Sequence, residues 1–380
     1  MSSTSPTLQW LELEQVQQRP WLHHANQAVP KRVQIADDSI SADTAYRLAC
    51  EGTGLLWRGD FQNAKNLLQA IARRIDHKPK RTKKTTPITD TPLEAFHKHR
   101  QQQAQRARVL NMLLIEVDAD FHIALRRAPD IKQACLEAYG QQEAAFVTSL
   151  RELLGIIGAH EWRKNGVFIA ALQAKIHPYY GIFSPVRGEY LDLIAKAPLP
   201  SAELAFDIGT GSGVIAALLA KRGVKKIIAT DLEARALACA AENAQNLNVA
   251  SHIEFLQTDL FPTGRAPLIV CNPPWLPVRP NTMIENAIYD PDSRMLKGFL
   301  TGLKDHLEQD GEAWLIMSDF AEHLGLRSHE QLWSWIELAG MKVAGKLDIR
   351  PQHKKTQDTN DPLHQARAAE ITSLWRIRHQ

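Results

Sequence analysis

The second half of the chain alternates short apolar runs with stretches of helical periodicity. The runs are closed by polar or turn residues and predict strands, and the periodic stretches predict helices. Expected strands are Leu204–Asp207, Lys226–Thr230, Ile253–Leu256, Leu268–Cys271 and Glu312–Met317, with helices starting near Val214, Glu233, Ser293 and His329. Met341–Ile349 and Ile371–Ile377 would close the sheet as a hairpin. This alternation is typical of an α/β protein with a doubly wound sheet.

The first half of the chain has mainly helical spacing. Helical patterns cover Ser41 to Asp76, with breaks near Gly52, Gly54 and Gly59, then Leu93 to Arg108 and Ile131 to Leu154. A Lys- and Thr-rich segment near residues 77–92 is too polar to bury much surface and reads as a basic loop. We therefore expect a mostly helical N-terminal region over residues 1–177, with a role in substrate recognition, and an α/β domain over residues 178–380.

Composition adds few constraints to this picture. With 380 residues, 44% of them hydrophobic, the chain can form at least one full core, and its net charge of +3 neither requires nor excludes a nucleic-acid partner. Its four cysteines lie far apart without the spacing of a zinc site, so we expect no metal and a reducing, cytoplasmic location. No segment has the length of a membrane span or the pattern of a signal peptide.

Three alternate glycines, Gly209, Gly211 and Gly213, separate the first predicted strand of this domain from the helix at Val214. Glycine allows a ligand to approach the main chain beside a helix N-terminus, so this loop indicates a nucleotide-like ligand. Asp231 ends the next strand, where an acid that binds ribose hydroxyls is expected. The spacing differs from the loop that grips a pyrophosphate, which favours a cofactor without phosphate.

The runs FDIGTGSG, ATD, TDLF and NPPW, in this order, resemble class I S-adenosylmethionine-dependent methyltransferases. The resemblance covers about half of the chain, from Tyr180 onward, and implies a Rossmann-like sheet of seven strands. It implies that Asp231 holds the ribose of the cofactor, and Asp259 with Leu260 the adenine. The rest of the implied cofactor site comprises Asp207, Gly209, Thr210, Gly211, Gly213, Leu232 and Asn272.

The stretch IVCNPPW, Ile269 to Trp275, ends an apolar strand with an amide, two prolines and an indole. The Asn272 side-chain carbonyl and the Pro273 main-chain carbonyl can accept hydrogen bonds from an amine nitrogen as it is methylated. Pro273 and Pro274 stiffen the loop, and Trp275 offers a flat face for a planar group. We therefore predict these four residues to be catalytic and the target nitrogen to be planar; no general base is required.

This motif resembles the one found in enzymes that methylate exocyclic amines of bases or the side-chain amide of glutamine. The segment YYGIFSPVRGEY resembles the part of such enzymes that folds over the cofactor, and Phe183, Arg187 and Glu189 are its candidate substrate-binding residues. The residues from Glu285 to Asp290, with Leu296 to Leu300, loosely resemble release-factor glutamine methyltransferases.

Three functions remain open from the sequence. About ten Lys and Arg residues against three acids between Arg73 and Arg108 favour an RNA substrate, or less readily DNA. The alternative is a protein glutamine methyltransferase acting on a release factor or a ribosomal protein. The third is a cofactor-binding module without catalysis, which the intact Asp231, Asp259 and Asn272 disfavour.

Overall fold

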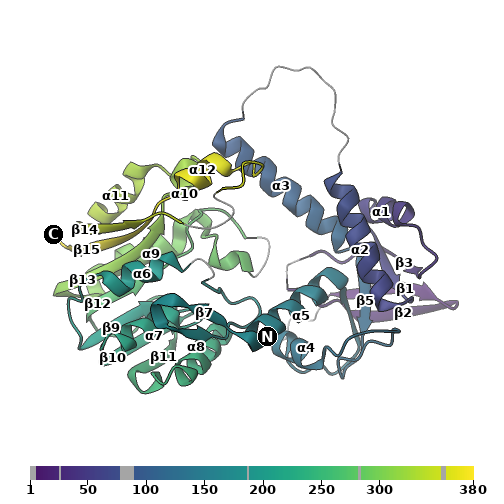
Figure 1. Ribbon diagram of the computed structural model, residues 1–380, viewed down its shortest axis with the longest axis horizontal. Helices are drawn as coiled ribbons and strands as arrows, with labels where there is room; N and C mark the ends of the chain where they lie inside the picture. Colours follow the sequence, from purple (N-terminus) through teal and green to yellow (C-terminus); the bar gives the residue numbers. More distant parts are fainter. Residues whose placement is uncertain (1–5, 25–26, 78–89, 186–187, 281–283, 352–356) are drawn as a thin grey trace. The chain divides into compact units, whose positions relative to one another are not determined.

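A sheet of seven strands forms the centre of the second half of the chain (Figure 1). The computed structural model describes residues 6–24, 27–77, 90–185, 188–280, 284–351 and 357–380. The strand order is β11-β10-β9-β12-β13-β15-β14, and β15 alone runs antiparallel to its neighbours in this sheet. The strands are β9 Leu204–Ile208, β10 Lys226–Asp231, β11 Ile253–Gln257, β12 Ala266–Cys271, β13 Leu307–Ser318, β14 Met341–Ile349 and β15 Thr372–His379. The predicted α/β sheet and its closing hairpin are confirmed.

Helices cover both faces of this sheet (Figure 1). One face packs against α6, α7 and α8, and the other against α9 and α11. β12 is buried along nearly its whole length, since both of its faces meet helices, which explains its continuous apolar run. The helices are α6 Glu189–Lys196, α7 Val214–Lys221, α8 Ala234–Asn246, α9 Arg294–His306, α10 Phe320–His323, α11 His329–Leu338 and α12 His364–Ala369.

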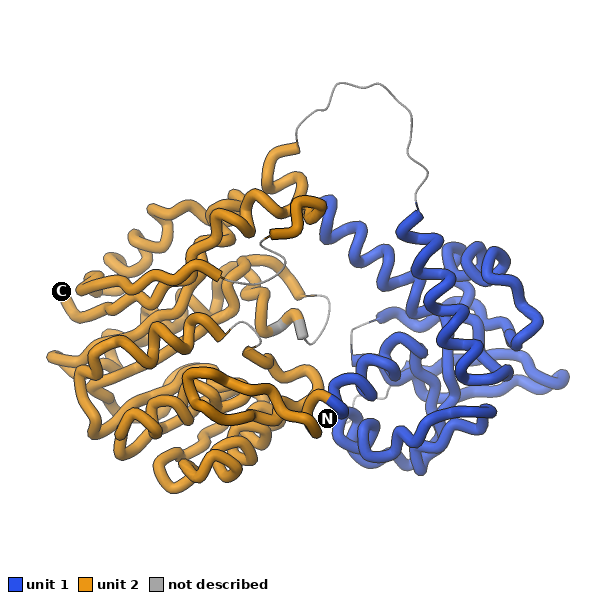
Figure 2. The backbone as a smooth tube through the Cα atoms, viewed as in Figure 1, with its two compact units in different colours: residues 1–89, 98–161 blue, residues 90–97, 162–380 orange. Residues whose placement is uncertain are grey.

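The chain divides into two compact units (Figure 2). Unit 1 comprises residues 1–89 and 98–161, and unit 2 comprises residues 90–97 and 162–380. The small hairpin of β7 Val167–Ile169 and β8 Ala174–Ile176 and the first residues of α3 therefore belong to the unit that contains the large sheet. No helix in the described part of the chain is both long and apolar enough to cross a membrane.

Unit 1 contains a sheet of four strands, so the expectation of a mostly helical region is corrected. The order is β3-β4-β5-β6, with the first three strands parallel, and β1 and β2 form a separate hairpin. The strands are β1 Thr7–Glu12, β2 Gln15–Pro20, β3 Arg32–Ala36, β4 Thr53–Trp57, β5 Leu113–Val117 and β6 Phe146–Ser149; the helices are α1 Ala42–Cys50, α2 Phe61–Asp76, α3 Pro92–Leu110, α4 Lys132–Tyr139 and α5 Leu150–Asn165. β4 and β6 are short and fully buried, and such runs cannot be distinguished from helix by periodicity.

Candidate functional site

The glycine loop and the NPPW motif meet at the point where the strand order of the large sheet reverses. β9 lies between β10 and β12, and Ile208 pairs with Cys271 at the carboxyl ends of β9 and β12. Gly209 and Asn272 are therefore the next residues along two neighbouring parallel strands. Such a switch point is where open α/β sheets bind their ligands.

The three glycines of the loop have different surroundings. All three have positive φ: 71° at Gly209, 55° at Gly211 and 79° at Gly213. A Cβ on Gly213 would lie 2.8 Å from the Cβ of Ala240 in α8, and one on Gly209 would lie 2.5 Å from the Cε of Met295 in α9. A Cβ on Gly211 meets nothing within 4 Å. Gly213 therefore permits helix packing, whereas Gly211 borders open space that a ligand can fill.

Asp207 is a buried acid directly below this loop. One carboxylate oxygen accepts hydrogen bonds from the Thr210 hydroxyl at 2.6 Å and the Ala216 N–H at 3.0 Å. The other oxygen is buried and has no hydrogen-bond partner among the described residues. Burial raises the pKa of Asp207 to about 7, although its two hydrogen bonds act in the opposite direction.

Asp231 is positioned by the glycine loop. Its Oδ2 accepts a hydrogen bond from the Gly211 N–H at 3.0 Å, and its Oδ1 accepts one from the Glu233 N–H, also at 3.0 Å. The neighbouring Leu232 is 57% exposed. The Asp231 carboxylate thus lies beside Gly211, where the loop borders open space.

Asp259 and Leu260 follow the end of β11. The Asp259 carboxylate is half-exposed and forms an ion pair with Arg294, the first residue of α9. Leu260 has a φ of 70°, and its carbonyl oxygen accepts a hydrogen bond from the Thr230 hydroxyl at 2.6 Å. The Leu260 side chain packs with the core on the α9 face of the sheet. The structure therefore places this pair beside the end of β10, where Asp231 lies.

The NPPW motif forms a rigid corner after β12. The indole N–H of Trp275 donates a hydrogen bond to the side-chain oxygen of Asn272 at 3.0 Å. Trp275 is partly buried and packs against the cores on both faces of the sheet. Pro273 is buried, and Asn272 and Pro274 are half-buried. The amide oxygen of Asn272 has a second lone pair, so it can accept from Trp275 and from a ligand at the same time.

Two residues beside this corner were not singled out from the sequence. Tyr190 in α6 is 3% exposed; burial and the Asp207 carboxylate raise its pKa, and a hydrogen bond with the Asn272 side chain acts in the opposite direction. Asp290 accepts hydrogen bonds from the N–H groups of Met295 and Leu296, and its own N–H binds the carbonyl of Leu276. Each residue ends a segment marked in the sequence, but only the fold shows that it lies beside the NPPW corner.

The segment before α6 is fixed to α8. The Tyr179 hydroxyl donates to the Glu242 carboxylate at 2.7 Å, and Arg235 donates to the Tyr180 carbonyl at 3.1 Å. Phe183 is half-buried in the same segment, and Glu189 is the first residue of α6. Arg187 lies outside the described residues, as does most of the basic loop near 77–92. Phe183 and Glu189 thus lie in unit 2, and their role in substrate binding stays a prediction.

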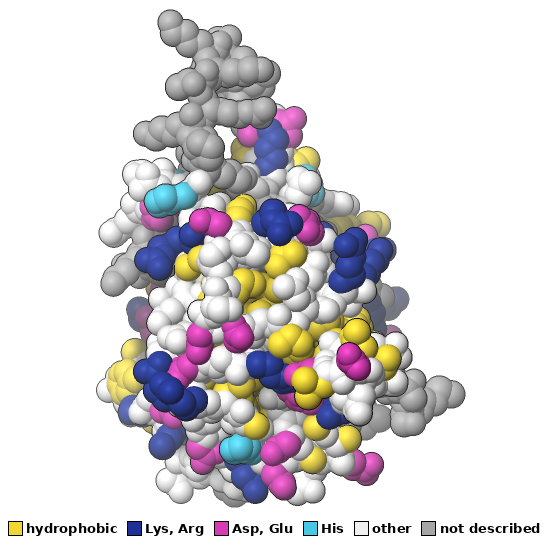
Figure 3. All heavy atoms as spheres, turned by 90° about the vertical axis from the view of Figure 1, so that its right-hand side faces the viewer, with side chains coloured by type: hydrophobic (Ala, Val, Ile, Leu, Met, Phe, Trp, Pro, Cys, Tyr) yellow, Lys and Arg dark blue, Asp and Glu magenta, His cyan; other side chains and the backbone are white. Residues whose placement is uncertain are grey.

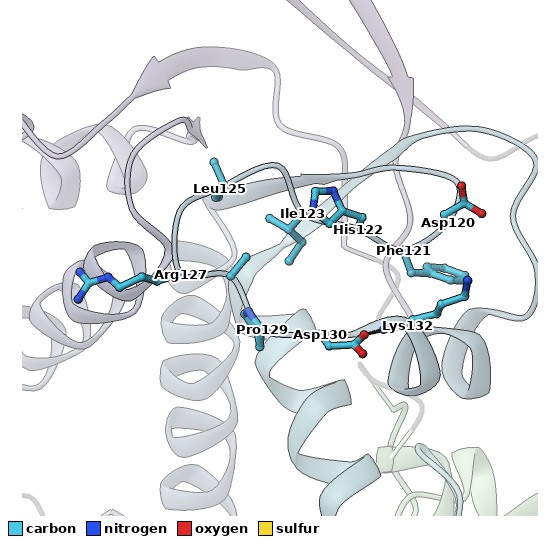
Figure 4. Close-up of a pocket in the computed structure, with 10 residues that line it drawn as sticks. Asp120, Phe121, His122, Ile123, Leu125, Arg127, Pro129, Asp130 and Lys132 are labelled. Atoms are coloured by element: carbon cyan, nitrogen blue, oxygen red, sulfur yellow. Dashed lines mark hydrogen bonds between the residues drawn. The ribbon is translucent and has the colours of Figure 1, made fainter.

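Unit 1 contains a hollow of about 490 Å³ in the loop between β5 and α4 (Figure 4). Its lining combines apolar side chains such as Phe121, Ile123 and Leu125 with the charged ends of Asp130 and Lys132. None of its lining residues belongs to the glycine loop, to NPPW or to the segment before α6, all of which lie in unit 2. The candidate chemistry therefore lies entirely in unit 2.

Comparison with known proteins agrees with the geometry of unit 2. Residues 191–329 match the model of the family described as "Methyltransferase small domain". The chain is 32% identical over 158 residues to the "putative protein N5-glutamine methyltransferase" of Methanocaldococcus jannaschii, an alignment that covers 40% of this chain and 78% of that protein.

Two bacterial enzymes match shorter parts of the chain. A release factor glutamine methyltransferase of Cereibacter sphaeroides is 45% identical over 93 residues, which are 24% of this chain and 34% of that enzyme. The tRNA1(Val) (adenine(37)-N6)-methyltransferase of Proteus mirabilis is 42% identical over 89 residues, which are 21% of this chain and 35% of that enzyme. The chain thus spans about a third of the length of these two relatives.

Proposed function

This chain belongs to the methyltransferase small domain family and uses S-adenosylmethionine, and from this premise we propose that it methylates an exocyclic base nitrogen in RNA. The observation that carries the proposal is the position of Asn272. It follows β12 at the switch point, one residue beyond the pair Cys271 and Ile208, with its side-chain oxygen held by Trp275. A fixed carbonyl oxygen beside the glycine loop can accept a hydrogen bond from the amine that is to be methylated.

The residues around the glycine loop fit the cofactor. The open space at Gly211 can hold the methionyl part, and Asp231 can accept hydrogen bonds from ribose hydroxyls. The second oxygen of Asp207 has no hydrogen-bond partner among the described residues. Asp259, Leu260 and Leu232 are suited to the adenine. The bound cofactor supplies an electrophilic methyl group on a positively charged sulfur.

In this proposal the protein's part in the chemistry is to orient the target nitrogen. Asn272 and the main-chain carbonyl of Pro273 accept hydrogen bonds from its two N–H groups, which draws electron density toward the nitrogen. The fixed φ angles of Pro273 and Pro274 hold both acceptors in place, so little reorganisation is needed during transfer. The nitrogen loses its proton after methylation, and no side chain is required as a base.

An RNA substrate is supported by charge and by one relative. The basic residues between Arg73 and Arg108 give a local positive field, although Arg74 pairs with Asp43 and Arg106 with Asp76. On the face of the molecule shown in Figure 3, Lys and Arg side chains are interspersed with Asp and Glu. The Proteus mirabilis relative is named for an adenine amine of tRNA. With no spanning helix in the described residues, a cytoplasmic location fits such a substrate.

A protein glutamine substrate is the second candidate, and the names of two relatives favour it. A glutamine amide is also planar and offers two N–H groups to the same two carbonyl oxygens. Its support is the loose resemblance from Glu285 to Leu300, a segment in which Asp290 fixes the start of α9. A module that binds cofactor without catalysis would need no aimed Asn272, which makes it the weakest of the three.

The test is incubation of the full chain with isotopically labelled S-adenosylmethionine and with RNA, DNA and protein fractions from cells that lack the enzyme. We expect label in RNA, and loss of more than about 100-fold in rate for Asn272→Ala. Asn246→Ala, at the exposed end of α8, is the matched control and keeps its activity. Label confined to protein would establish the second candidate, and binding of cofactor without any labelled fraction would establish the third.

A further inference from the structure

Asp290 joins the chain that leaves the NPPW corner to the first turn of α9. Its main-chain N–H donates to the carbonyl of Leu276 at 2.8 Å, and Leu276 directly follows Trp275. Its two side-chain oxygens accept hydrogen bonds from the N–H groups of Met295 at 2.9 Å and Leu296 at 3.0 Å. Asp290 is 5% exposed. One buried residue is thus bonded to the corner through its main chain and to the helix through its carboxylate.

The backbone between Asp290 and α9 has an unfavourable conformation. Asp292 has a φ of 57° and Ser293 a φ of 54°, both in the left-handed region that side chains other than glycine disfavour. Such residues persist where surrounding contacts determine the path of the chain. The two hydrogen bonds to the Asp290 carboxylate are contacts of this kind, because they hold the first turn of α9 after the two left-handed residues.

The first turn of α9 contacts the glycine loop through Met295. A Cβ placed on Gly209 would lie 2.5 Å from the Cε of Met295 and 3.9 Å from its sulfur. Gly209 is the residue after β9 at the switch point, and Met295 is only partly buried. The Met295 side chain therefore packs directly on the main chain of the loop that is expected to hold the methionyl part of the cofactor.

The same helix packs on the segment expected to hold the adenine. Arg294 forms an ion pair with the Asp259 carboxylate. One turn further along α9, a Cβ placed on Gly298 would lie 2.7 Å from the Cδ1 of Leu260, so the helix approaches this segment closely. The start of α9 thus borders both loops of the cofactor site.

We propose that Asp290 is a positioning residue for S-adenosylmethionine: it fixes the first turn of α9, so that Met295 and Arg294 hold the glycine loop and Asp259 in their binding positions. This step rests on the proposed function for the cofactor and not for the acceptor. Because Asp290 is also bonded to Leu276, it fixes α9 relative to the NPPW corner. Methyl transfer depends on such alignment between the two halves of the site.

The test is calorimetric titration of the full chain with S-adenosylhomocysteine. Asp290→Asn keeps the size of the side chain, but its amide nitrogen cannot accept an N–H. We expect its Kd to be about tenfold higher, the value of one lost hydrogen bond, and a similar rise for Met295→Ala. Independent effects would multiply to about 100-fold in the double variant. We expect a rise of roughly 10- to 20-fold, because Asp290 acts in part through Met295.

The matched control is Ser328→Ala, which removes the cap of another helix in unit 2. The Ser328 hydroxyl oxygen accepts a hydrogen bond from the Gln331 N–H at 3.2 Å at the start of α11, which contains no residue of the candidate cofactor site. Ser328→Ala and Asp290→Asn should both lower Tm, and only Asp290→Asn should raise the Kd. An unchanged Kd in Asp290→Asn, an equal rise in Ser328→Ala, or a 100-fold rise in the double variant would overturn the role of Asp290.

Failure of the proposed function would look different. If RNA takes up no label while Asp290→Asn still raises the Kd about tenfold, the RNA substrate is wrong and the role of Asp290 is supported. If wild-type protein does not bind S-adenosylhomocysteine, both the proposed function and the role of Asp290 are overturned.

Discussion

The indole N–H of Trp275 lies 3.0 Å from the side-chain oxygen of Asn272 and donates a hydrogen bond to it. Trp275 lies three residues after Asn272 and fixes the side-chain amide that the proposed chemistry needs, because its indole is itself packed against the cores on both faces of the sheet. Trp275, which the sequence predicts as a stacking surface, therefore also holds the Asn272 side chain in place. A phenylalanine or tyrosine side chain at this position has no N–H to place there.

Trp275→Phe keeps an aromatic ring and removes the N–H donor. We expect kcat to fall roughly tenfold, because the amide of Asn272 is no longer fixed, while the Kd for cofactor is unchanged. Steady-state kinetics with the labelled substrate and calorimetric cofactor binding measure the two quantities. Trp333→Phe is the control, since that indole donates at 2.9 Å to His329 in α11. Wild-type kcat in Trp275→Phe would show that the N–H has no part in positioning.

The large sheet was predictable because its local signals agree. The strands β9, β10 and β12 are short apolar runs closed by polar or turn residues, and Met341–Ile349 was predicted with the bounds that β14 has. In unit 1 the strands Thr53–Trp57 and Phe146–Ser149 were missed because they are brief and buried on both faces, without alternation.

The candidate site was predictable only as far as its residues form local motifs. Gly211, Asp231 and Asn272 sit in short patterns whose chemistry can be read from the chain. Tyr190 and Asp290 each end a segment that the sequence marks, but their places beside the NPPW corner depend on which strands and helices become neighbours. The bond between Trp275 and Asn272 likewise depends on the path of two prolines between them.

Asp231→Ala removes the carboxylate that binds the Gly211 N–H. We expect the Kd for cofactor to rise roughly 10- to 100-fold, since both an anchor of the loop and an acceptor for ribose are lost, with less effect on kcat at saturating cofactor. Calorimetry gives the first value and kinetics the second. Glu254→Gln, which removes a surface ion pair with Lys226, should leave both unchanged. An unaltered Kd in Asp231→Ala would contradict the assignment.

Alanine at Gly211 should mainly weaken cofactor binding, whereas alanine at Gly213 should mainly lower the stability of the protein. The Gly211 variant adds a methyl group to open space, so it should weaken cofactor binding at least tenfold. Its φ of 55° is unfavourable for alanine and should lower the free energy of unfolding by about 1–2 kcal/mol. The Gly213 variant brings a Cβ to 2.8 Å from that of Ala240, and steric overlap adds about 1–3 kcal/mol to the φ penalty. Thermal unfolding and cofactor titration of both variants separate the effects. Equal losses of stability would show that Gly211 does not border a ligand space.

Asp207→Asn should change how stability depends on pH. An amide oxygen can keep the hydrogen bonds from Thr210 and Ala216, and the amide nitrogen replaces the unpartnered oxygen. The pKa of Asp207 is raised from 3.8 to about 7 by burial, so the native state binds its proton more tightly than the unfolded state. The stability that this proton contributes is present below pH 4 and is lost as the pH rises through 7.

The expected outcome is a difference in Tm between Asp207→Asn and wild type that grows in favour of the variant from pH 4 to pH 8, by on the order of 5 °C. Differential scanning calorimetry across this range measures it, and subtraction cancels the other titrating groups. Asp305→Asn, an exposed position of α9, should give a difference that does not vary with pH. If the Asp207→Asn difference were equally flat, Asp207 would be ionised in the native state throughout, and a cation near its free oxygen would have to compensate for its burial.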